Sequence, residues 1–278
     1  MANNPLKKYF RQPKVYVKLP SKGIFNQPGT LNGDPDNVSV YGMTGMDEIL
    51  VKTPDALLNG ESTTKVIESC CPTIKDAWDL CLLDLDLLLV AIRIATEGNT
   101  MAVSHTCSAC KEINDYDIDL GTFVQHFSTC EYNSKVPLED ITITLHPLNY
   151  KQWTEFQTKN FQIQRQLAQA MAMDAIEHEE EQKKLLAGLF EKVTVIQNDL
   201  LMQQVESVES PEGVTNQRQF IQEWLNNCDK SVFDAIKIKV EENRKRWELP
   251  AVKVVCESCK ADNSLFVNMD QSSFFANA

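Results

Sequence analysis

The chain has 278 residues, a formal net charge of −12 and a hydrophobic content of 43%. This hydrophobic content is sufficient for a packed core, which excludes a globally disordered chain. A surface with so many carboxylates repels phosphate groups, which argues against duplex nucleic acid and anionic membranes as partners. The composition therefore predicts a folded protein that neither binds nucleic acid nor inserts into a membrane.

The N-terminal segment is polar and basic, without the apolar stretch of a signal peptide. We therefore expect a reducing compartment, in which the nine cysteines are free thiols or metal ligands rather than disulfides. The basic residues Lys7, Lys8 and Arg11 lie in this segment, and we expect them on a solvated surface.

Residues 14–43 are predicted to contribute two strands. In residues 14–19, apolar side chains alternate with Tyr16 and Lys18, which indicates a half-buried strand. Proline and glycine then mark a loop, and residues 37–43 are predicted to form the second strand.

The pattern then changes to helical. Thr44 is expected to cap a short helix that carries Asp47 in its first turn, where a carboxylate suits the helix dipole. Further short helices are predicted over residues 53–60 and 62–69. A main helix is predicted from about residue 74 to residue 96, with apolar residues around most of its circumference. This helix should be central and buried.

Residues 101–120 read as strand, tight turn and strand, and residues 141–148 as another strand. Residues 150–247 contain little glycine and are predicted to form a helical insert. Within it we expect a long helix or helical hairpin with a possible break at Gly188. A turn at 210–213 and helices over 215–228 and 229–246 should follow.

Two C-x-x-C pairs, Cys107 with Cys110 and Cys256 with Cys259, each sit in a strand-turn-strand context. Two intervening residues place both sulfurs of a pair on one edge of a tetrahedron, and four thiolates close the coordination shell of Zn²⁺. We therefore predict that the four cysteines form a split zinc ribbon with one structural zinc ion. Zinc is favoured over iron by four thiolates at this spacing.

The long separation between the two pairs leaves alternatives open. Four unrelated reduced thiols are one alternative, and a redox pair is another, although neither pair begins a helix as thioredoxin-type motifs do. His105 precedes the first pair and is interpreted as a bystander. The remaining five cysteines are expected to be single or buried thiols.

The predicted fold is α+β: a small β-containing body with a central buried helix and the split four-cysteine ribbon, plus a helical insert. We expect an N-terminal domain over residues 1–149 with the first cysteine pair and a helical insert over 150–247. C-terminal strands over 248–278 then complete the ribbon.

No common catalytic motif is present in the sequence. The run of residues 80–95 carries acids within an apolar helix, and Asp79, Asp86 and Arg93 are spaced seven apart on one stripe. A buried acid site is one interpretation. We favour acids that cap loops or pair with a neighbouring base, because buried charges usually persist only when paired.

Four stretches together resemble the baseplate hub protein family of T-even bacteriophages. They read LKKYFRQPKVYVKLPSKG, MTGMDEILVKTPDALLNGESTTKVIESCCP, DLDLLLVAIRIATEGNTM and CSACKEINDYDIDL. The similarity spans roughly residues 5–150, and the run D-E-I-L-x-K-T-P-D-A-L-L-N-G is its most specific part. The family's cysteine motif falls on Cys107 and Cys110, and its acidic helix motif on Asp84, Asp86 and Arg93, where it suggests a structural salt link.

The resemblance implies a non-enzymatic tail protein, either a structural component or an assembly factor of the baseplate hub. Its partners would be other baseplate hub or tail proteins, and its location the host cytoplasm during assembly and the virion tail if retained. One alternative is a tail-assembly chaperone for a helical component such as the tape-measure protein. A zinc-ribbon nucleic-acid binder is a second alternative, disfavoured by acidic residues around the cysteines, and an unrecognised hydrolase is a third.

Overall fold

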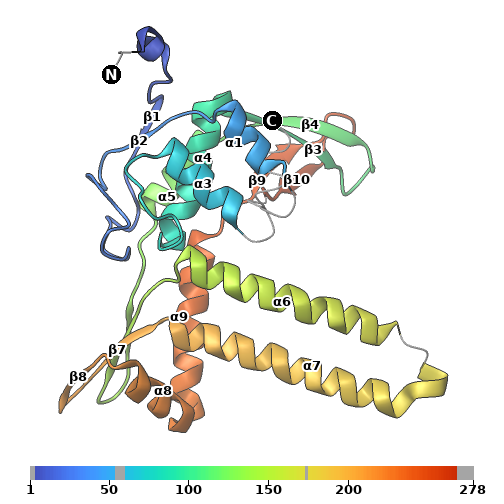
Figure 1. Cartoon of the computed structure of the whole chain (residues 1–278). Helices are drawn as coiled ribbons and strands as arrows, with labels where there is room; N and C mark the ends of the chain where they lie inside the picture. The colour runs from blue at the N-terminus through green and yellow to red at the C-terminus, as the bar shows by residue number, and fades with distance from the viewer. Residues whose placement is uncertain (1–3, 54–59, 173–174, 268–278) are drawn as a thin grey trace. The chain divides into compact units, whose positions relative to one another are not determined.

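The computed structural model describes residues 4–53, 60–172 and 175–267, and the chain divides into two units (Figure 1). The first unit contains residues 1–131 together with 247–278, and the second contains residues 132–246. Both helices and small antiparallel sheets are present, which confirms the predicted α+β class.

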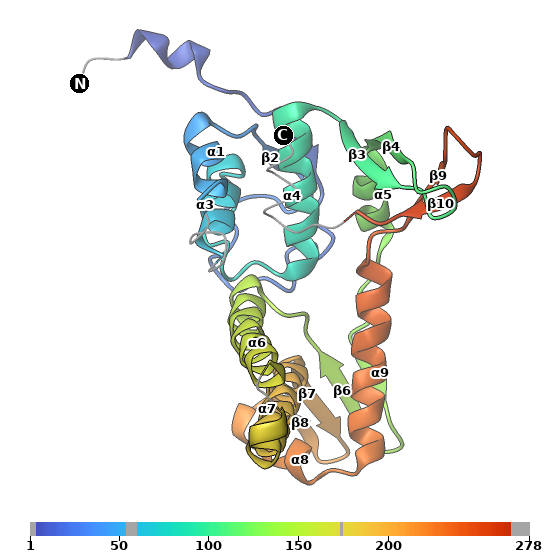
Figure 2. The ribbon, with the colours of Figure 1, turned by 90° about the vertical axis from the view of Figure 1, so that its right-hand side faces the viewer.

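The first unit is built around helix α4, Leu82–Glu97. Leu87, Leu88 and Ile92 are at most 1% exposed, because the helix is covered on several sides by neighbouring elements. Helices α3 (Glu61–Cys70) and α5 (Gly121–Thr129) and strand β1 (Val15–Val17) pack against it. Figure 2 shows α3 running beside α4. The predicted central buried helix is thus confirmed.

Helix α4 begins at Leu82, so the predicted start near residue 74 is wrong. Side chains bind the backbone N–H groups that a longer helix would use. Glu68 accepts a hydrogen bond from the N–H of Ala77 at 3.0 Å, and Asn26 accepts one from Cys81 at 2.7 Å. The sequence pattern did not reveal this competition, because both acceptors are distant along the chain.

The other elements of the N-terminal part follow the predicted order. Strand β1 pairs antiparallel with β2 (Val38–Val40), and helix α1 (Gly45–Val51) comes next. Thr44 caps α1, and Asp47 completes a capping box, as the sequence predicts. Most of the predicted helix over residues 53–60 lies outside the described residues.

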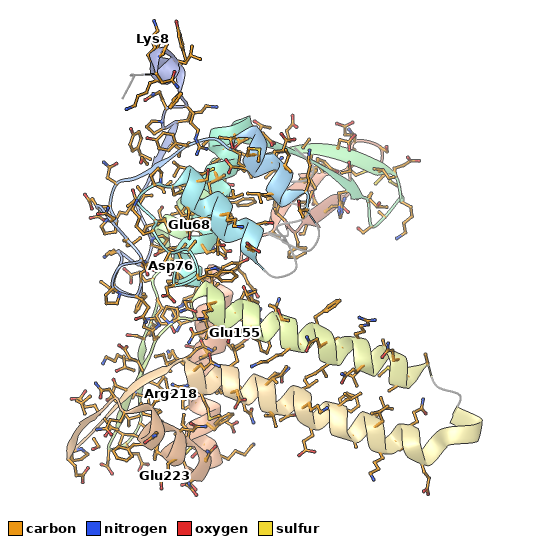
Figure 3. The ribbon with its side chains drawn as sticks, in the orientation of Figure 1. Lys8, Glu68, Asp76, Glu155, Arg218 and Glu223 are labelled. Carbon is orange, nitrogen blue, oxygen red and sulfur yellow. The ribbon has the colours of Figure 1, made fainter. Side chains whose placement is uncertain are left out.

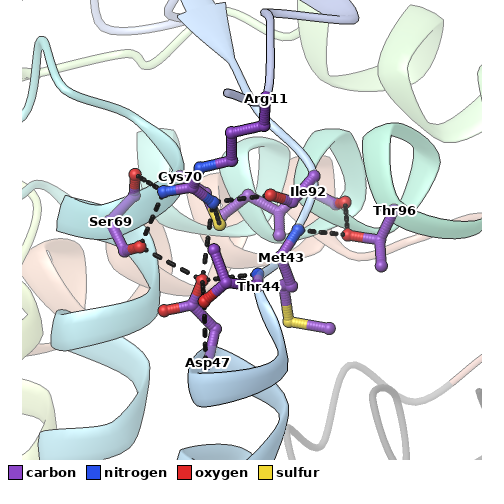
Figure 4. A network of polar contacts seen from close by, with 9 residues as sticks. Arg11, Met43, Thr44, Asp47, Ser69, Cys70, Ile92 and Thr96 are labelled. Carbon is purple, nitrogen blue, oxygen red and sulfur yellow. Dashed lines mark hydrogen bonds and ion pairs between the residues drawn. The ribbon is translucent and has the colours of Figure 1, made fainter. Parts of the chain in front are cut away.

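Arg11 is exposed, as the sequence predicts, but its guanidinium also binds polar groups within the first unit (Figure 4). Its guanidinium donates hydrogen bonds to the carbonyl oxygens of Gly42 (2.6 Å) and Ser69 (2.7 Å) and to the Ser69 hydroxyl (2.9 Å). It also forms an ion pair with Asp47 at 3.5 Å. Asp47 therefore contributes both to the capping box of α1 and to this polar network, and it is itself buried, at 4% exposed. The preceding short helix η1 (Pro5–Tyr9) has no buried residue.

Two antiparallel hairpins complete the first unit. Strands β3 (Thr100–Thr106) and β4 (Ile113–Asp119) form one, and β9 (Val252–Val255) and β10 (Asp262–Leu265) form the other. Both confirm the strand-turn-strand prediction around the cysteine pairs. Figure 2 shows the β9–β10 hairpin lying against β3 and β4.

The second unit contains a helical hairpin of α6 (Tyr150–Met171) and α7 (Ala175–Gln203). Gly188 lies inside α7, so this glycine is not the break between the two helices. Buried and half-buried residues recur at alternating spacings of three and four along both helices, which is the seam of an antiparallel coiled coil. The seam residues are Trp153, Phe156, Asn160, Ile163, Leu167 and Ala170 on α6 and Leu186, Leu189, Val193, Ile196 and Leu200 on α7.

A four-stranded antiparallel sheet forms the rest of the second unit with helices α8 (Arg218–Asn227) and α9 (Lys230–Trp247). Its strands are β5 (Lys135–Pro137), β6 (Thr142–Leu145), β7 (Val205–Ser210) and β8 (Gly213–Thr215). The predicted turn at 210–213 connects β7 and β8. Ile143, Val205 and Ile221 lie at the centre of this core.

The double role of Asp47 leads to a prediction for stability. Asp47→Ala removes the Asp47 half of the α1 capping box and leaves the Arg11 guanidinium without its carboxylate, so the free energy of unfolding should fall by about 1–3 kcal/mol. Asp36→Ala is the control, since Asp36 pairs with Lys18 on the surface, where both side chains are 55% exposed. It should change stability by no more than about 0.5 kcal/mol in urea titrations. Equal effects of the two variants would contradict the network's importance.

Candidate metal centre

The four predicted ligands come together within the first unit. Cys107 and Cys110 lie in the turn between β3 and β4, and Cys256 and Cys259 in the turn between β9 and β10. All four sulfur atoms lie within 4.8 Å of one another. The two pairs, separated by a long excursion of the chain, therefore form one cluster.

The sulfur spacing fits tetrahedral coordination. The Sγ atoms of Cys107 and Cys259 are 3.7 Å apart, and those of Cys110 and Cys256 are 3.6 Å apart. A tetrahedron with Zn–S bonds of about 2.3 Å has edges of about 3.8 Å. The donor set and its dimensions are therefore compatible with a zinc ion held by four thiolates.

The backbone of each turn favours the thiolate form of its first cysteine. The N–H groups of Cys110 and Ala109 point at the Cys107 sulfur and lower the pKa of this thiol to about 6. The N–H of Cys259 likewise lowers the pKa of Cys256. For Cys110, the Glu112 N–H lowers the pKa, but burial and the adjacent cysteine sulfurs prevail and raise it to about 12. The cluster therefore carries both thiolate and thiol character until a cation replaces the protons.

The two turns have the same backbone geometry. Cys107 donates its N–H to Glu112 at 2.9 Å, and Cys256 donates its N–H to Ala261 at 3.0 Å. The residue after the second cysteine is left-handed in both, with φ of 65° at Lys111 and 63° at Lys260. This conformation turns the chain back toward the sulfurs, and it is unfavourable for a residue with a side chain.

Two buried asparagines, Asn114 on β4 and Asn263 on β10, connect the turns reciprocally. The Asn114 side chain donates to the Cys256 sulfur (3.5 Å) and accepts from the N–H of Glu257 (3.0 Å). The Asn263 side chain donates to the Cys107 sulfur (3.5 Å) and accepts from the N–H of Ser108 (3.0 Å). Each asparagine thus binds the first cysteine of the other hairpin.

These asparagines were missed in the sequence, although a signal for them exists. Residues 107–114 and 256–263 both read C-x-x-C-K-x-x-N. The repeat therefore extends beyond the cysteines to the left-handed lysine and the buried asparagine. The spacing alone does not reveal that each asparagine reaches the opposite copy of the motif.

The other candidate residues lie outside the cluster. His105 is on β3, paired with Asn114 in the register of the hairpin, and is not among the clustered groups. Asp84 is fully buried and accepts hydrogen bonds from the backbone N–H of Ser21 (2.9 Å) and the amide of Asn26 (2.7 Å). This carboxylate therefore holds the loop after β1, as the loop-capping interpretation predicts. Arg93 forms an ion pair with Glu97 at 3.0 Å, one turn along α4.

Among the remaining cysteines, Cys70, Cys71 and Cys81 are buried. Burial and the nearby Asp47 raise the pKa of Cys70 to about 11, and burial also raises the pKa of Cys71 and Cys81. These thiols are therefore neutral and pack as core side chains.

Two surface depressions lie elsewhere in the described residues; Figure 3 labels Glu68 and Asp76 beside one and Arg218 beside the other. One, of about 530 Å³, is lined by Glu61, Thr64, Lys65, Glu68, Lys75, Asp76 and Trp78. The other, of about 220 Å³, lies beside Asp199 and Arg218, and burial lowers the pKa of this arginine. Neither depression contains a cysteine or histidine among its lining residues, and we assign no reaction to either. In the described part of the chain, no helix is both long and apolar enough to cross a bilayer.

The fold and the cluster define a class of protein: an α+β body in which two distant hairpins meet at a four-cysteine site. A family model described as T4 bacteriophage base plate protein matches residues 43–276. The chain therefore belongs to this baseplate protein family, and the match extends the resemblance through the second cysteine pair. Among curated proteins and among solved structures, no significant match to the chain exists.

The left-handed residues give a test of the turn geometry. Lys111→Gly removes the steric cost of positive φ and should leave the free energy of unfolding unchanged or raise it by up to about 1 kcal/mol. Lys111→Val should lower it by about 1–2 kcal/mol, because a β-branched residue disfavours this conformation.

Lys253→Gly is the control, because Lys253 lies in strand β9. Glycine in a strand should cost about 0.5–1 kcal/mol, the opposite sign to Lys111→Gly. Urea titrations at matched metal content measure all three variants. Destabilisation by glycine at both positions would contradict the assigned turn conformation.

Proposed function

We propose that the protein is a non-enzymatic component or assembly factor of the phage baseplate hub, held together by a structural zinc ion. The zinc ligands are Cys107, Cys110, Cys256 and Cys259. The observation that carries the proposal is the convergence of these sulfurs within 4.8 Å in a chain of the baseplate family. A closed four-thiolate shell leaves no position for a reacting water, so the metal stabilises the fold instead of acting in catalysis.

The position of the cluster in the chain supports a structural role. One cysteine pair follows the central helix, and the other follows the whole second unit. A metal bound by both pairs contributes its binding free energy to folding, because the unfolded chain has no preformed site. In this proposal, residues 1–131 and 247–278, which carry the two cysteine pairs, act as one body, and the second unit is an insert between them.

The partners in this proposal are other hub or tail proteins. The protein would be made in the host cytoplasm and incorporated into the virion tail. Binding to the phage DNA is not part of the proposal. On β4 beside the cluster, Asp115, Asp117 and Asp119 are exposed, and this row of carboxylates repels phosphates. The same observation disfavours the zinc-ribbon nucleic-acid binder.

A tail-assembly chaperone is the second candidate function. The observation that favours it is the α6–α7 hairpin, on which Phe161 (61%), Met171 (60%) and Phe190 (53%) are more than half exposed. Exposed aromatic and methionine side chains on helices suit a helical partner such as the tape-measure protein. A chaperone would be bound to that partner before assembly and be absent from the finished particle.

Metal content is the first test. Elemental analysis of the purified chain should give about one zinc per chain. Cys256→Ser should abolish it, and chelation should lower the stability of the first unit by several kcal/mol. Cys228→Ser is the matched control, because this half-buried thiol lies in the second unit and outside the cluster. Zinc retained by Cys256→Ser, or absent from the unaltered chain, would refute the metal site.

Particle composition is the second test. Quantitative mass spectrometry of purified phage and of tail-assembly intermediates should detect the protein in both, at a constant ratio to other baseplate proteins. Detection in intermediates alone would favour an assembly factor, and detection in a complex with the tape-measure protein alone would favour the chaperone. Absence from both preparations would contradict every tail function considered.

A further inference from the structure

Each amide of the asparagine pair makes two kinds of contact at the cluster. The carbonyl oxygens of Asn114 and Asn263 accept from backbone N–H groups of the opposite turn, both at 3.0 Å. Their NH₂ groups donate to the opposite cysteine sulfur and to a carbonyl oxygen of their own turn, that of Glu112 or Ala261. The bond to the backbone N–H and the bond to the sulfur of each amide therefore cross between the hairpins, and Asn263 also accepts from the Ser108 hydroxyl at 3.0 Å.

The carbonyl oxygens accept from backbone N–H groups, and the Asn114 oxygen also lies 3.6 Å from the Cys256 sulfur. The bonds to the N–H groups of Glu257 and Ser108 contain no metal ligand atom, so we expect them to form whether or not a cation is bound. Both side chains are 6% exposed, and a buried amide that lost these partners would remain unsatisfied. The two hairpins are thus fastened by polar contacts in addition to the cysteines.

The bonds made by the NH₂ groups act on the sulfurs directly. Four thiolates around one divalent cation carry an excess of negative charge, which hydrogen-bond donors offset. Partners that orient and polarise metal ligands typically alter metal affinity by factors of about 10–100. Within the described residues, the first cysteine of each pair, Cys107 or Cys256, receives this N–H···S contact from an asparagine, and the second does not.

We propose that Asn114 and Asn263 are positioning residues of the metal centre, which fasten the two hairpins before metal binds and increase the affinity for zinc. The proposal rests on the proposed zinc site. It adds a specific requirement: each half of the site depends on a residue supplied by the other half. Zinc binding therefore depends on the whole repeated C-x-x-C-K-x-x-N motif and not on the cysteine pair alone.

Zinc affinity tests the role of the NH₂ groups. In competition with a chromogenic chelator, Asn114→Ala and Asn263→Ala should each bind zinc about 10–100-fold more weakly than the unaltered chain. Asn114→Asp retains an acceptor for the Glu257 N–H but loses the NH₂ donor, and should also bind more weakly. When Co²⁺ replaces zinc as the probe, the sulfur-to-cobalt charge-transfer band of Asn114→Asp should be shifted from that of the unaltered chain. A general loss of stability would not shift this band.

The matched control is Asn243→Ala. Asn243 is equally buried, at 3% exposed, and its amide makes two comparable bonds to the backbone of Asn133 in the second unit. This variant should lower stability but keep zinc affinity within about twofold of the unaltered chain. A similar loss of affinity in Asn243→Ala would show that general destabilisation is responsible and would overturn the proposal.

Hydrogen exchange tests the fastening before metal binds. In the reduced, chelator-treated full chain, the backbone amides of Ser108 and Glu257 should be protected from exchange. Asn263→Ala should remove the protection of Ser108, and Asn114→Ala should remove that of Glu257. Unchanged protection together with unchanged zinc affinity would overturn the proposal while leaving the zinc site intact. If the unaltered chain bound no zinc, the metal site itself would fail, and with it the affinity role of the asparagines.

Discussion

The convergence of four cysteine sulfurs is the constraint on which the first unit depends. It joins the turn after β3 to the turn after β9, although the whole second unit separates them along the chain. The cluster lies on two small hairpins, and isolated two-stranded hairpins are marginally stable in water. The reciprocal asparagine bonds connect the two hairpins, and a metal bound by the four sulfurs would add the stability that so little apolar burial cannot provide.

The first unit also shows how buried polar groups replace regular structure where the chain must change direction. Asp84 binds the loop after β1, Asn26 and Glu68 occupy N–H groups ahead of α4, and Arg11 binds carbonyl oxygens around α1 and α3. In each case a side chain from a distant segment satisfies a backbone group. Such contacts fix one arrangement of the loops, because a buried backbone group without a partner is costly.

The helices, caps and hairpins that depend on neighbouring residues could be predicted from the sequence. The apolar circumference of the helix predicted over residues 74–96 indicates a central helix, Thr44 and Asp47 indicate the cap of α1, and the strand context of the cysteines indicates paired hairpins. The parts that could not be predicted depend on distant contacts, such as the late start of α4 and the anchoring of Arg11. For the candidate site, the cysteines are evident from their spacing. The asparagines required the structure, because their targets lie in the opposite copy of the motif.

The position of the second cysteine pair near the C-terminus has a consequence for synthesis. At translation rates of roughly 5–20 residues per second, the ribosome adds Cys256 about 7–30 seconds after Cys110. During this interval the second unit can fold on its own contacts, while the first hairpin waits with its thiols unpaired. Any chain released early lacks the closing half. In such a chain the turn with Cys107 and Cys110 has no partner thiols, and Asn114 has neither the Cys256 sulfur nor the Glu257 N–H to bind.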